Sequence, residues 1–175
     1  MTISRVLILC RGNLCRSPMA AALLGQRLPG AVVRSAGLAA AVGEPAVSEV
    51  IALLASSGID VSAHRAVQVT RSMCDEADLI LVMSGAQRHA LHDVFAHTRG
   101  KVFLLSDGRD VADPYGRSNA HFNACFDVIS PAIEQWARRI GSESPMQPFV
   151  SDRWIECLPN AIGRAAATSE TGAQR

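Results

Sequence analysis

The strongest constraint on the fold is the stretch of residues 6–19, which reads VLILCRGNLCRSPM. Its four leading apolar residues predict a buried strand. A polar turn follows with Gly12 and Asn13, the residue types that most readily adopt positive φ. Ser17 and Pro18 predict a helix start, with serine as N-cap and proline at the first helical position. A strand, a tight loop and a helix start in this order turn backbone N–H groups toward one point, where an anion can bind.

The rest of the chain repeats this alternation of strand and helix. Apolar runs predict strands over residues 5–10, 31–36, 79–83 and 101–105. Helical spacing predicts helices over residues 18–28, 46–57, 71–76, 84–97 and 119–140. Strands that alternate with helices predict an α/β fold, a three-layer sandwich in which helices cover both faces of a four-stranded parallel sheet.

Two loops are expected at the same edge of this sheet. The cysteine-containing loop follows the first strand, and residues 106–118 (SDGRDVADPYGRS) follow the fourth. In a parallel sheet both loops leave at the carboxyl ends of the strands, where ligands bind. Asp113 is therefore expected to open on the same side as Cys10.

Composition excludes several classes of partner. The chain has 17 basic and 16 acidic residues, so its net charge of +1 predicts no recruitment of nucleic acid. No apolar run approaches the roughly 20 residues that span a bilayer, so no membrane insertion is expected. The N-terminus lacks the features of a signal peptide, which predicts a cytoplasmic protein. The five cysteines show no zinc spacing, so we expect neither a metal nor another cofactor.

A change in composition after residue 141 divides the chain. Residues 1–141 are predicted to form one domain, and residues 142–175 a C-terminal extension that is partly disordered. The extension is rich in serine and proline at its start and polar at its end. Cys74, Cys125 and Cys157 are interpreted as small buried hydrophobic residues.

The chemistry of the loop follows from Cys10 and Arg16, which flank five intervening residues. A helix N-terminus and a guanidinium stabilise a thiolate. The N–H groups of residues 11–16, which include Gly12, Leu14 and Cys15, would surround phosphoryl oxygens, and Arg16 would bind two of them. Ser17 can donate to the thiolate, and Asn13 can brace the loop. A buried strand end is the alternative for Cys10, but the spacing and the helix start favour a nucleophile.

Residues 10–19 resemble the phosphate-binding loop of low-molecular-weight protein tyrosine phosphatases. The resemblance continues at residues 35–37 (SAG), 62–65 (SAHR), 77–83 (ADLILVM) and 113–115 (DPY), and covers about residues 4–140. The bacterial branch tied to tyrosine kinases of exopolysaccharide export is the most similar. The resemblance implies a hydrolase that removes phosphate from phosphotyrosine, with a tyrosine-phosphorylated protein, such as that kinase, as its partner.

The same resemblance implies a role for individual residues. Cys10 would form a phosphocysteine intermediate, Arg16 would clamp the phosphate, and Asp113 would be the general acid and base. Ser35 and His64 would support the loop asparagine, and Tyr115 would form an aromatic wall. Cys15 has two interpretations: a reversible disulfide partner of Cys10, or a residue that fills space beneath the loop. Arg11 replaces a small or apolar residue usual in the family and adds positive charge at the pocket rim.

Two other functions compete with this one. A thiol-dependent arsenate reductase shares this loop, but it needs two further cysteines close together on a mobile segment. Cys74 has no such neighbour, and Pro18 replaces the glutamine expected there. A module that binds phosphotyrosine without turnover is the second alternative, against which the intact Cys10, Ser17 and Asp113 argue.

Overall fold

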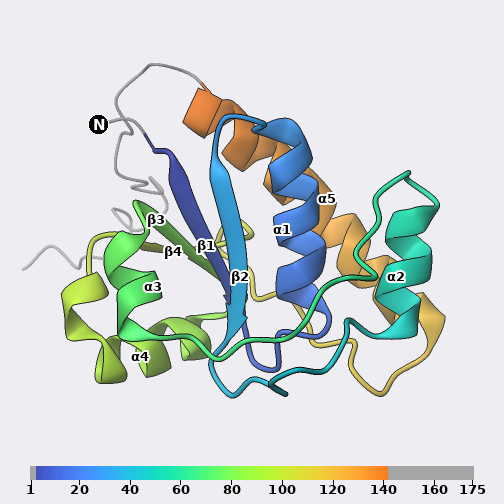
Figure 1. Cartoon of the computed structure of the whole chain (residues 1–175), viewed down its shortest axis with the longest axis horizontal. Helices are drawn as coiled ribbons and strands as arrows, with labels where there is room; N and C mark the ends of the chain where they lie inside the picture. Colours follow the sequence, from blue (N-terminus) through green and yellow to red (C-terminus); the bar gives the residue numbers. More distant parts are fainter. Residues whose placement is uncertain (1–2, 142–175) are drawn as a thin grey trace, which may run out of the picture. The chain divides into compact units, whose positions relative to one another are not determined.

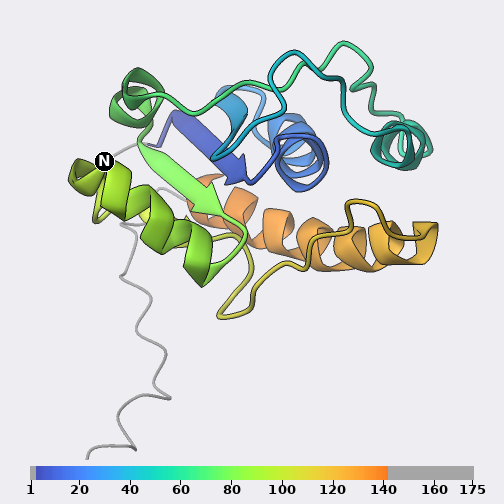
Figure 2. The same cartoon turned by 90° about the horizontal axis from the view of Figure 1, so that it is seen from below.

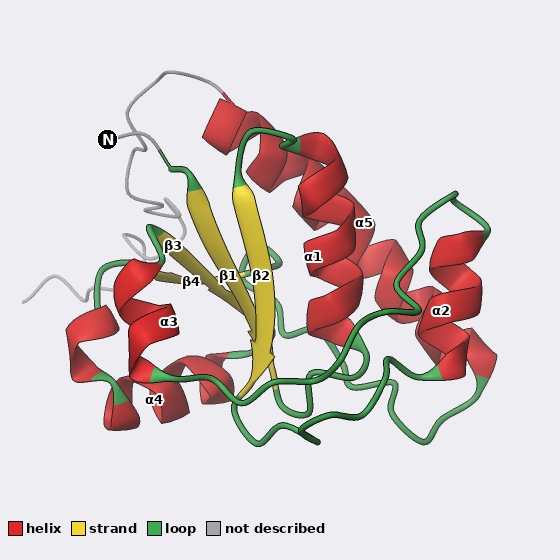
Figure 3. Cartoon of the chain, viewed as in Figure 1, coloured by secondary structure: helices red, strands yellow, loops and turns green. Residues whose placement is uncertain are grey.

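A computed structural model describes residues 3–141, and the expected extension of residues 142–175, with Cys157, lies outside the described part. Four parallel strands form one sheet with the order β2-β1-β3-β4. The strands are β1 (Arg5–Cys10), β2 (Val32–Gly37), β3 (Leu79–Val82) and β4 (Val102–Leu104). The helices are α1 (Arg16–Arg27), α2 (Ser48–Ala55), α3 (Arg71–Glu76), α4 (Gly85–Val94) and α5 (Asn119–Gly141), with a 3₁₀ turn at Ala96–Thr98. The predicted α/β sandwich is confirmed (Figure 3).

Helices cover both faces of the sheet (Figures 1 and 2). Side chains of a strand alternate between its faces, so β1 contributes to two separate cores. Val6, Ile8 and Cys10 pack in the core that contains α1 and α5. Leu7 and Leu9 pack in the core that contains α3 and α4. This two-sided burial explains why the strands read as unbroken apolar runs.

The start of α1 differs from the prediction. The helix begins at Arg16 with Cys15 as N-cap, so Ser17 is the second helical residue and Pro18 the third. Proline is tolerated there because the first four N–H groups of a helix have no partner within it. Ser17 does not cap the helix because its hydroxyl is held by Cys10 and Asn13 instead.

The helix predicted over residues 84–97 is shorter than expected. Ser84 caps α4 through a hydrogen bond from the Gln87 N–H, and the helix ends at Val94. Phe95 leaves the helical region with φ −126° and ψ 65°. The Thr98 hydroxyl then donates to the Phe95 carbonyl, which stabilises the separate 3₁₀ turn.

The described residues contain no helix long and apolar enough to cross a bilayer. Within residues 3–141 there is also no group of three or more His, Cys, Asp or Glu side chains that could hold a metal ion.

Candidate active site

The loop between β1 and α1 is held from outside through its carbonyl groups. The carbonyl oxygens of residues 10–14 all accept hydrogen bonds, over 2.8–3.2 Å, from other segments. The donors are the N–H groups of Leu38, Ala39, Ala41 and Val47 and the Nε2 atom of His64. In a trans peptide the C=O and N–H groups point in opposite directions. The N–H groups of residues 11–15 are therefore turned inward, and together they form a site for an anion.

Cys10 is the last residue of β1, where this loop begins, and is 2% exposed. Its Sγ atom accepts a hydrogen bond from the Asn13 N–H at 3.2 Å and lies 2.9 Å from the Ser17 hydroxyl. Ser17 Oγ already accepts from Asn13 Nδ2 at 2.9 Å. Its own hydrogen can point at the sulfur, and the Ala36 carbonyl at 3.5 Å is the longer alternative acceptor. Both contacts stabilise a negatively charged sulfur.

Asn13 is the bracing residue of the loop and is fully buried. It adopts a φ of 58°, which asparagine tolerates better than most residues. Its Nδ2 also donates to Ser35 Oγ at 2.9 Å, and its Oδ1 accepts from the Val67 N–H at 2.9 Å. His64 Nε2 must carry the hydrogen in its bond with the Asn13 carbonyl, because a carbonyl only accepts. The structure thus brings Ser35 and His64 onto Asn13.

Gly37, the last residue of β2, tests how closely the loop is packed. A Cβ on Gly37 would lie 2.7 Å from the Arg11 carbonyl oxygen and 2.8 Å from the Ala40 Cβ. We expect Gly37→Ala to lower the free energy of unfolding by about 1–3 kcal/mol because of this overlap. Gly25→Ala in α1 is the matched control, since a Cβ there meets nothing within 4 Å. Urea denaturation should show Gly25→Ala stabilising the protein by about 0.5–1 kcal/mol; equal shifts in both variants would contradict the expectation.

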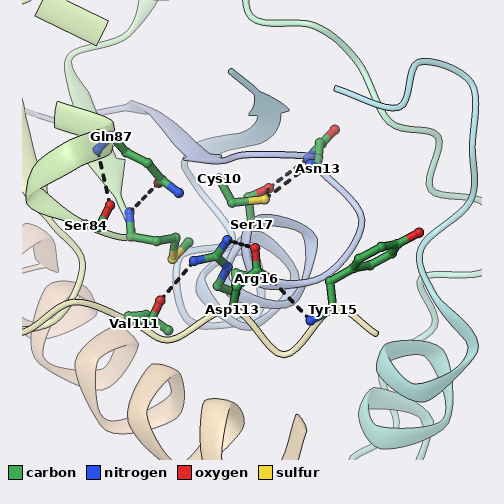
Figure 4. A network of polar contacts seen from close by, with 10 residues as sticks. Cys10, Asn13, Arg16, Ser17, Ser84, Gln87, Val111, Asp113 and Tyr115 are labelled. Atoms are coloured by element: carbon green, nitrogen blue, oxygen red, sulfur yellow. Dashed lines mark hydrogen bonds and ion pairs between the residues drawn. The ribbon is translucent and has the colours of Figure 1, made fainter. Parts of the chain in front are cut away.

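Arg16 lies in the first turn of α1 and is 5% exposed. One terminal nitrogen donates to the Val111 carbonyl at 2.9 Å, and the other forms an ion pair with Asp113 (Figure 4). Its Nε atom is buried without a hydrogen-bond partner. A buried donor without a partner is costly, and a phosphoryl oxygen in the loop would satisfy it.

Asp113 and Tyr115 belong to the loop between β4 and α5. The Val111 N–H donates to the Met83 carbonyl at 2.7 Å, which fixes this loop at the carboxyl end of β3. Asp113 Oδ1 accepts from the Tyr115 N–H at 3.2 Å, and its Oδ2 faces Arg16. Tyr115 is 61% exposed at the mouth of the site. Asp113 thus opens at the same sheet edge as Cys10 (Figure 4).

These segments enclose a cavity of about 380 Å³. The β1–α1 loop contributes Cys10, Arg11, Gly12, Leu14, Cys15 and Arg16 to its lining. Asp113 and Tyr115 lie on another side, and Ala39 and Ala41 complete the wall. The two alanines were missed by sequence reasoning, which placed no site residue between the strand predicted over residues 31–36 and the helix predicted over residues 46–57. Small residues after a Ser-Ala-Gly turn are a weak signal, because alanine has no chemistry of its own.

Two thiols near Cys10 have raised pKa values. Desolvation is the main cause that raises the pKa of Cys15 to about 12 and the pKa of Cys125 to about 11. Both thiols are therefore protonated near neutral pH and do not compete as nucleophiles. Cys74 and Cys125 are buried, as the sequence indicated.

A thiol beneath inward-facing N–H groups, with a buried arginine and a carboxyl group beside it, defines the phosphate site of a cysteine-dependent phosphatase. The family model described as "Low molecular weight phosphotyrosine protein phosphatase" matches residues 5–146. The chain belongs to this family, and it is a low-molecular-weight protein tyrosine phosphatase.

Individual relatives agree with this assignment. The probable low molecular weight protein-tyrosine-phosphatase EpsP of Ralstonia nicotianae is 44% identical over 140 residues, 79% of this chain and 97% of the relative. The structure of Vibrio vulnificus Wzb in complex with benzylphosphonate has a TM-score of 0.75 at 34% identity, and the match covers 78% of this chain and 98% of Wzb. The YwlE arginine phosphatase from Geobacillus stearothermophilus has a TM-score of 0.74 at 35% identity, over 78% of this chain and 92% of YwlE.

Proposed function

We propose that Cys10, Arg16 and Asp113 carry the hydrolysis of phosphotyrosine in this chain. The observation that carries the proposal is their convergence on one cavity, with the N–H groups of residues 11–15 turned toward it. The domain that performs the reaction is proposed to be residues 1–141.

In the first step the Cys10 thiolate attacks phosphorus, an S–P bond forms, and the P–O bond to the phenol breaks. Asp113 gives its proton to the departing phenolate oxygen. Arg16 and the loop N–H groups hold the equatorial oxygens, where negative charge is spread in the transition state. The product of this step is a phosphocysteine on Cys10.

In the second step Asp113 acts as a base. Its carboxylate takes a proton from a water molecule, whose oxygen attacks phosphorus as the S–P bond breaks. Inorganic phosphate leaves and Cys10 returns as a thiolate. The hydrogen bonds from Asn13 and Ser17 to the sulfur support this leaving group.

The other site residues position the substrate or the loop. Gly12, Leu14 and Cys15 present N–H groups to phosphate, and Leu14 adds apolar wall. Ser35 and His64 hold Asn13, and through it the curvature of the loop. Tyr115 offers an aromatic surface at the cavity mouth, next to the position of a bound phenyl ring.

The proposed substrate is a tyrosine-phosphorylated protein, with a bacterial tyrosine kinase of exopolysaccharide export as the candidate. Similarity to EpsP and Wzb supports it, and Wzb binds benzylphosphonate, an aromatic ring joined to a phosphate-like group. We place the reaction in the cytoplasm, where a reducing environment keeps a nucleophilic thiol active. The arsenate reductase alternative loses support because Cys74 is buried within α3.

The test is phosphate release from one peptide sequence that carries phosphotyrosine or phosphoserine. The phosphoserine side chain is shorter and lacks a ring for the walls of Leu14 and Tyr115, so we expect phosphotyrosine to be preferred by at least about 100-fold in kcat/KM. Equal rates would contradict the proposal. Tight binding of the phosphotyrosine peptide without phosphate release would support the non-catalytic module instead.

A further inference from the structure

The charge at the cavity mouth is carried by one residue. Besides the Cys10 thiolate of the proposed mechanism, which faces the phosphate, three residues that line the cavity are charged: Arg11, Arg16 and Asp113. Arg16 and Asp113 form an ion pair and compensate each other. Arg11 is exposed, and its guanidinium has no hydrogen bond or ion pair with any residue of the 3–141 range. The cavity therefore has an uncompensated positive charge beyond the donors that bind phosphate.

The backbone of Arg11 is held in place although its side chain is free. Its carbonyl oxygen accepts from the Ala39 N–H at 2.9 Å, and the closely packed Gly37 lies behind it. Because the Arg11 backbone is fixed, its guanidinium can reach only positions at the rim of the cavity that lie within the length of its own side chain. The other wall residues are uncharged: Leu14, Ala39, Ala41 and Tyr115. Arg11 is thus the group that can respond to the charge of the substrate outside its phosphate.

We propose that Arg11 is a specificity-determining residue, which favours phosphotyrosine next to acidic residues and disfavours phosphoarginine. The inference rests on the proposed function and specifies its substrate. A carboxylate beside the phosphotyrosine would meet an unpaired guanidinium and would not have to break an existing ion pair. Exposed ion pairs of this kind are worth about a twofold to fivefold change in an equilibrium constant.

The same charge acts against phosphoarginine. There the phosphoryl group is bonded directly to a guanidino group, so a delocalised positive charge takes the place of the neutral phenyl ring. That charge would lie among Arg11, Leu14 and Tyr115. The acidic residue of the lining, Asp113, is already paired with Arg16. The guanidinium of Arg11 and the guanidino group of the substrate carry like charges and repel each other. The phenyl ring of phosphotyrosine instead meets apolar and aromatic walls. Because the YwlE arginine phosphatase has a similar fold, discrimination between phosphotyrosine and phosphoarginine is a relevant question for this chain.

The experiment compares two phosphotyrosine peptides of equal length, one with glutamate and one with lysine on both sides of the phosphotyrosine. We measure the ratio of their kcat/KM values, Glu peptide over Lys peptide, for the wild type, Arg11→Gln and Arg11→Glu. The ratio is internal to each variant, so a general loss of activity cancels. Arg99→Glu is the matched control, because Arg99 is exposed and precedes β4 at the opposite edge of the sheet.

We expect a ratio of about 5 for the wild type, a ratio near 1 for Arg11→Gln and an inverted ratio for Arg11→Glu. Arg99→Glu should keep the wild-type ratio, and about 0.5 M salt should reduce it toward 1. The wild type should release phosphate from phosphoarginine slowly, and Arg11→Glu should raise the rate relative to phosphotyrosine.

The two proposals fail in different ways. Equal rates on both peptides in the wild type, or an unchanged ratio in Arg11→Glu, would overturn the role of Arg11 and leave the phosphatase mechanism standing. The same loss of preference in Arg99→Glu would also overturn it, because the effect would then belong to net charge. No hydrolysis of either peptide by the wild type would instead contradict the proposed function.

Discussion

Cys10→Ser is expected to lower kcat/KM for an aryl phosphate by at least about 10⁴-fold, as loss of a covalent nucleophile does in other enzymes. A thiol is a few per cent ionised at neutral pH, whereas a serine hydroxyl needs a base to become a nucleophile. The described contacts of the sulfur are the Asn13 N–H and the Ser17 hydroxyl, which can donate hydrogen bonds to it. Steady-state hydrolysis of p-nitrophenyl phosphate measures the loss.

The control for this variant is Cys74→Ser, the same exchange at another buried thiol. Cys74 packs in the core on the other face of the sheet and lines no part of the cavity. Its replacement should cost stability and keep the activity of the folded protein. Cys10→Ser should still bind a phosphotyrosine peptide, because the loop N–H groups and Arg16 are unchanged. Retention of more than about 1% of the activity in Cys10→Ser would rule out Cys10 as the nucleophile.

Asp113→Asn should slow hydrolysis most where the leaving group is poor. An asparagine keeps the size of the side chain but holds no proton to transfer. For phenyl phosphate, whose phenolate needs that proton, we expect a loss of about 10²–10⁴-fold in kcat/KM, which reports the first step alone. For 2,4-dinitrophenyl phosphate, whose anion leaves without protonation, the loss should be about tenfold or less. The measurement is a plot of log(kcat/KM) against the acidity of the leaving phenol, which should be steeper for the variant.

Asp110→Asn is the matched control for the acid. Asp110 lies in the same loop and accepts a hydrogen bond from the Gly85 N–H at 3.0 Å, but it does not line the cavity. Its variant should leave the dependence on the leaving group as it is in the wild type. If Asp113→Asn slowed good and poor leaving groups equally, its effect would come from the lost pairing with Arg16, and Asp113 would not be the acid.

Much of the fold could be predicted because strongly patterned segments decide their own structure. The unbroken apolar runs of β1 and β3 identify strands covered on both faces, and these runs are the strands observed. Helix ends were less predictable, because they depend on which partner a polar side chain finds. Serine is a favourable N-cap residue, yet the hydroxyl of Ser17 is held by Cys10 and Asn13 inside the site. The local preference of serine for the N-cap position is therefore overridden by tertiary hydrogen bonds.

The candidate site likewise has parts that residue type reveals and parts that only tertiary contacts decide. Its proposed reactive groups could be selected from residue type and spacing: Cys10 and Arg16 flank the loop, and Asp113 follows a later strand. The walls and supports could not, because backbone groups and alanines have no signature of their own. Examples are the Val111 carbonyl that holds Arg16 and the Val67 N–H that holds Asn13.

By itself, therefore, the sequence determined the chemistry of this protein: a thiol, a guanidinium and a carboxyl group on loops at one edge of a parallel sheet. The tertiary structure decided how the loop of residues 11–15 works. Its carbonyls are drawn outward by residues 38–47 and His64, which are distant in sequence, and its N–H groups are turned inward as a result. Only the packed fold brings those donors to the loop, because hydrogen bonds of the backbone do not depend on residue type.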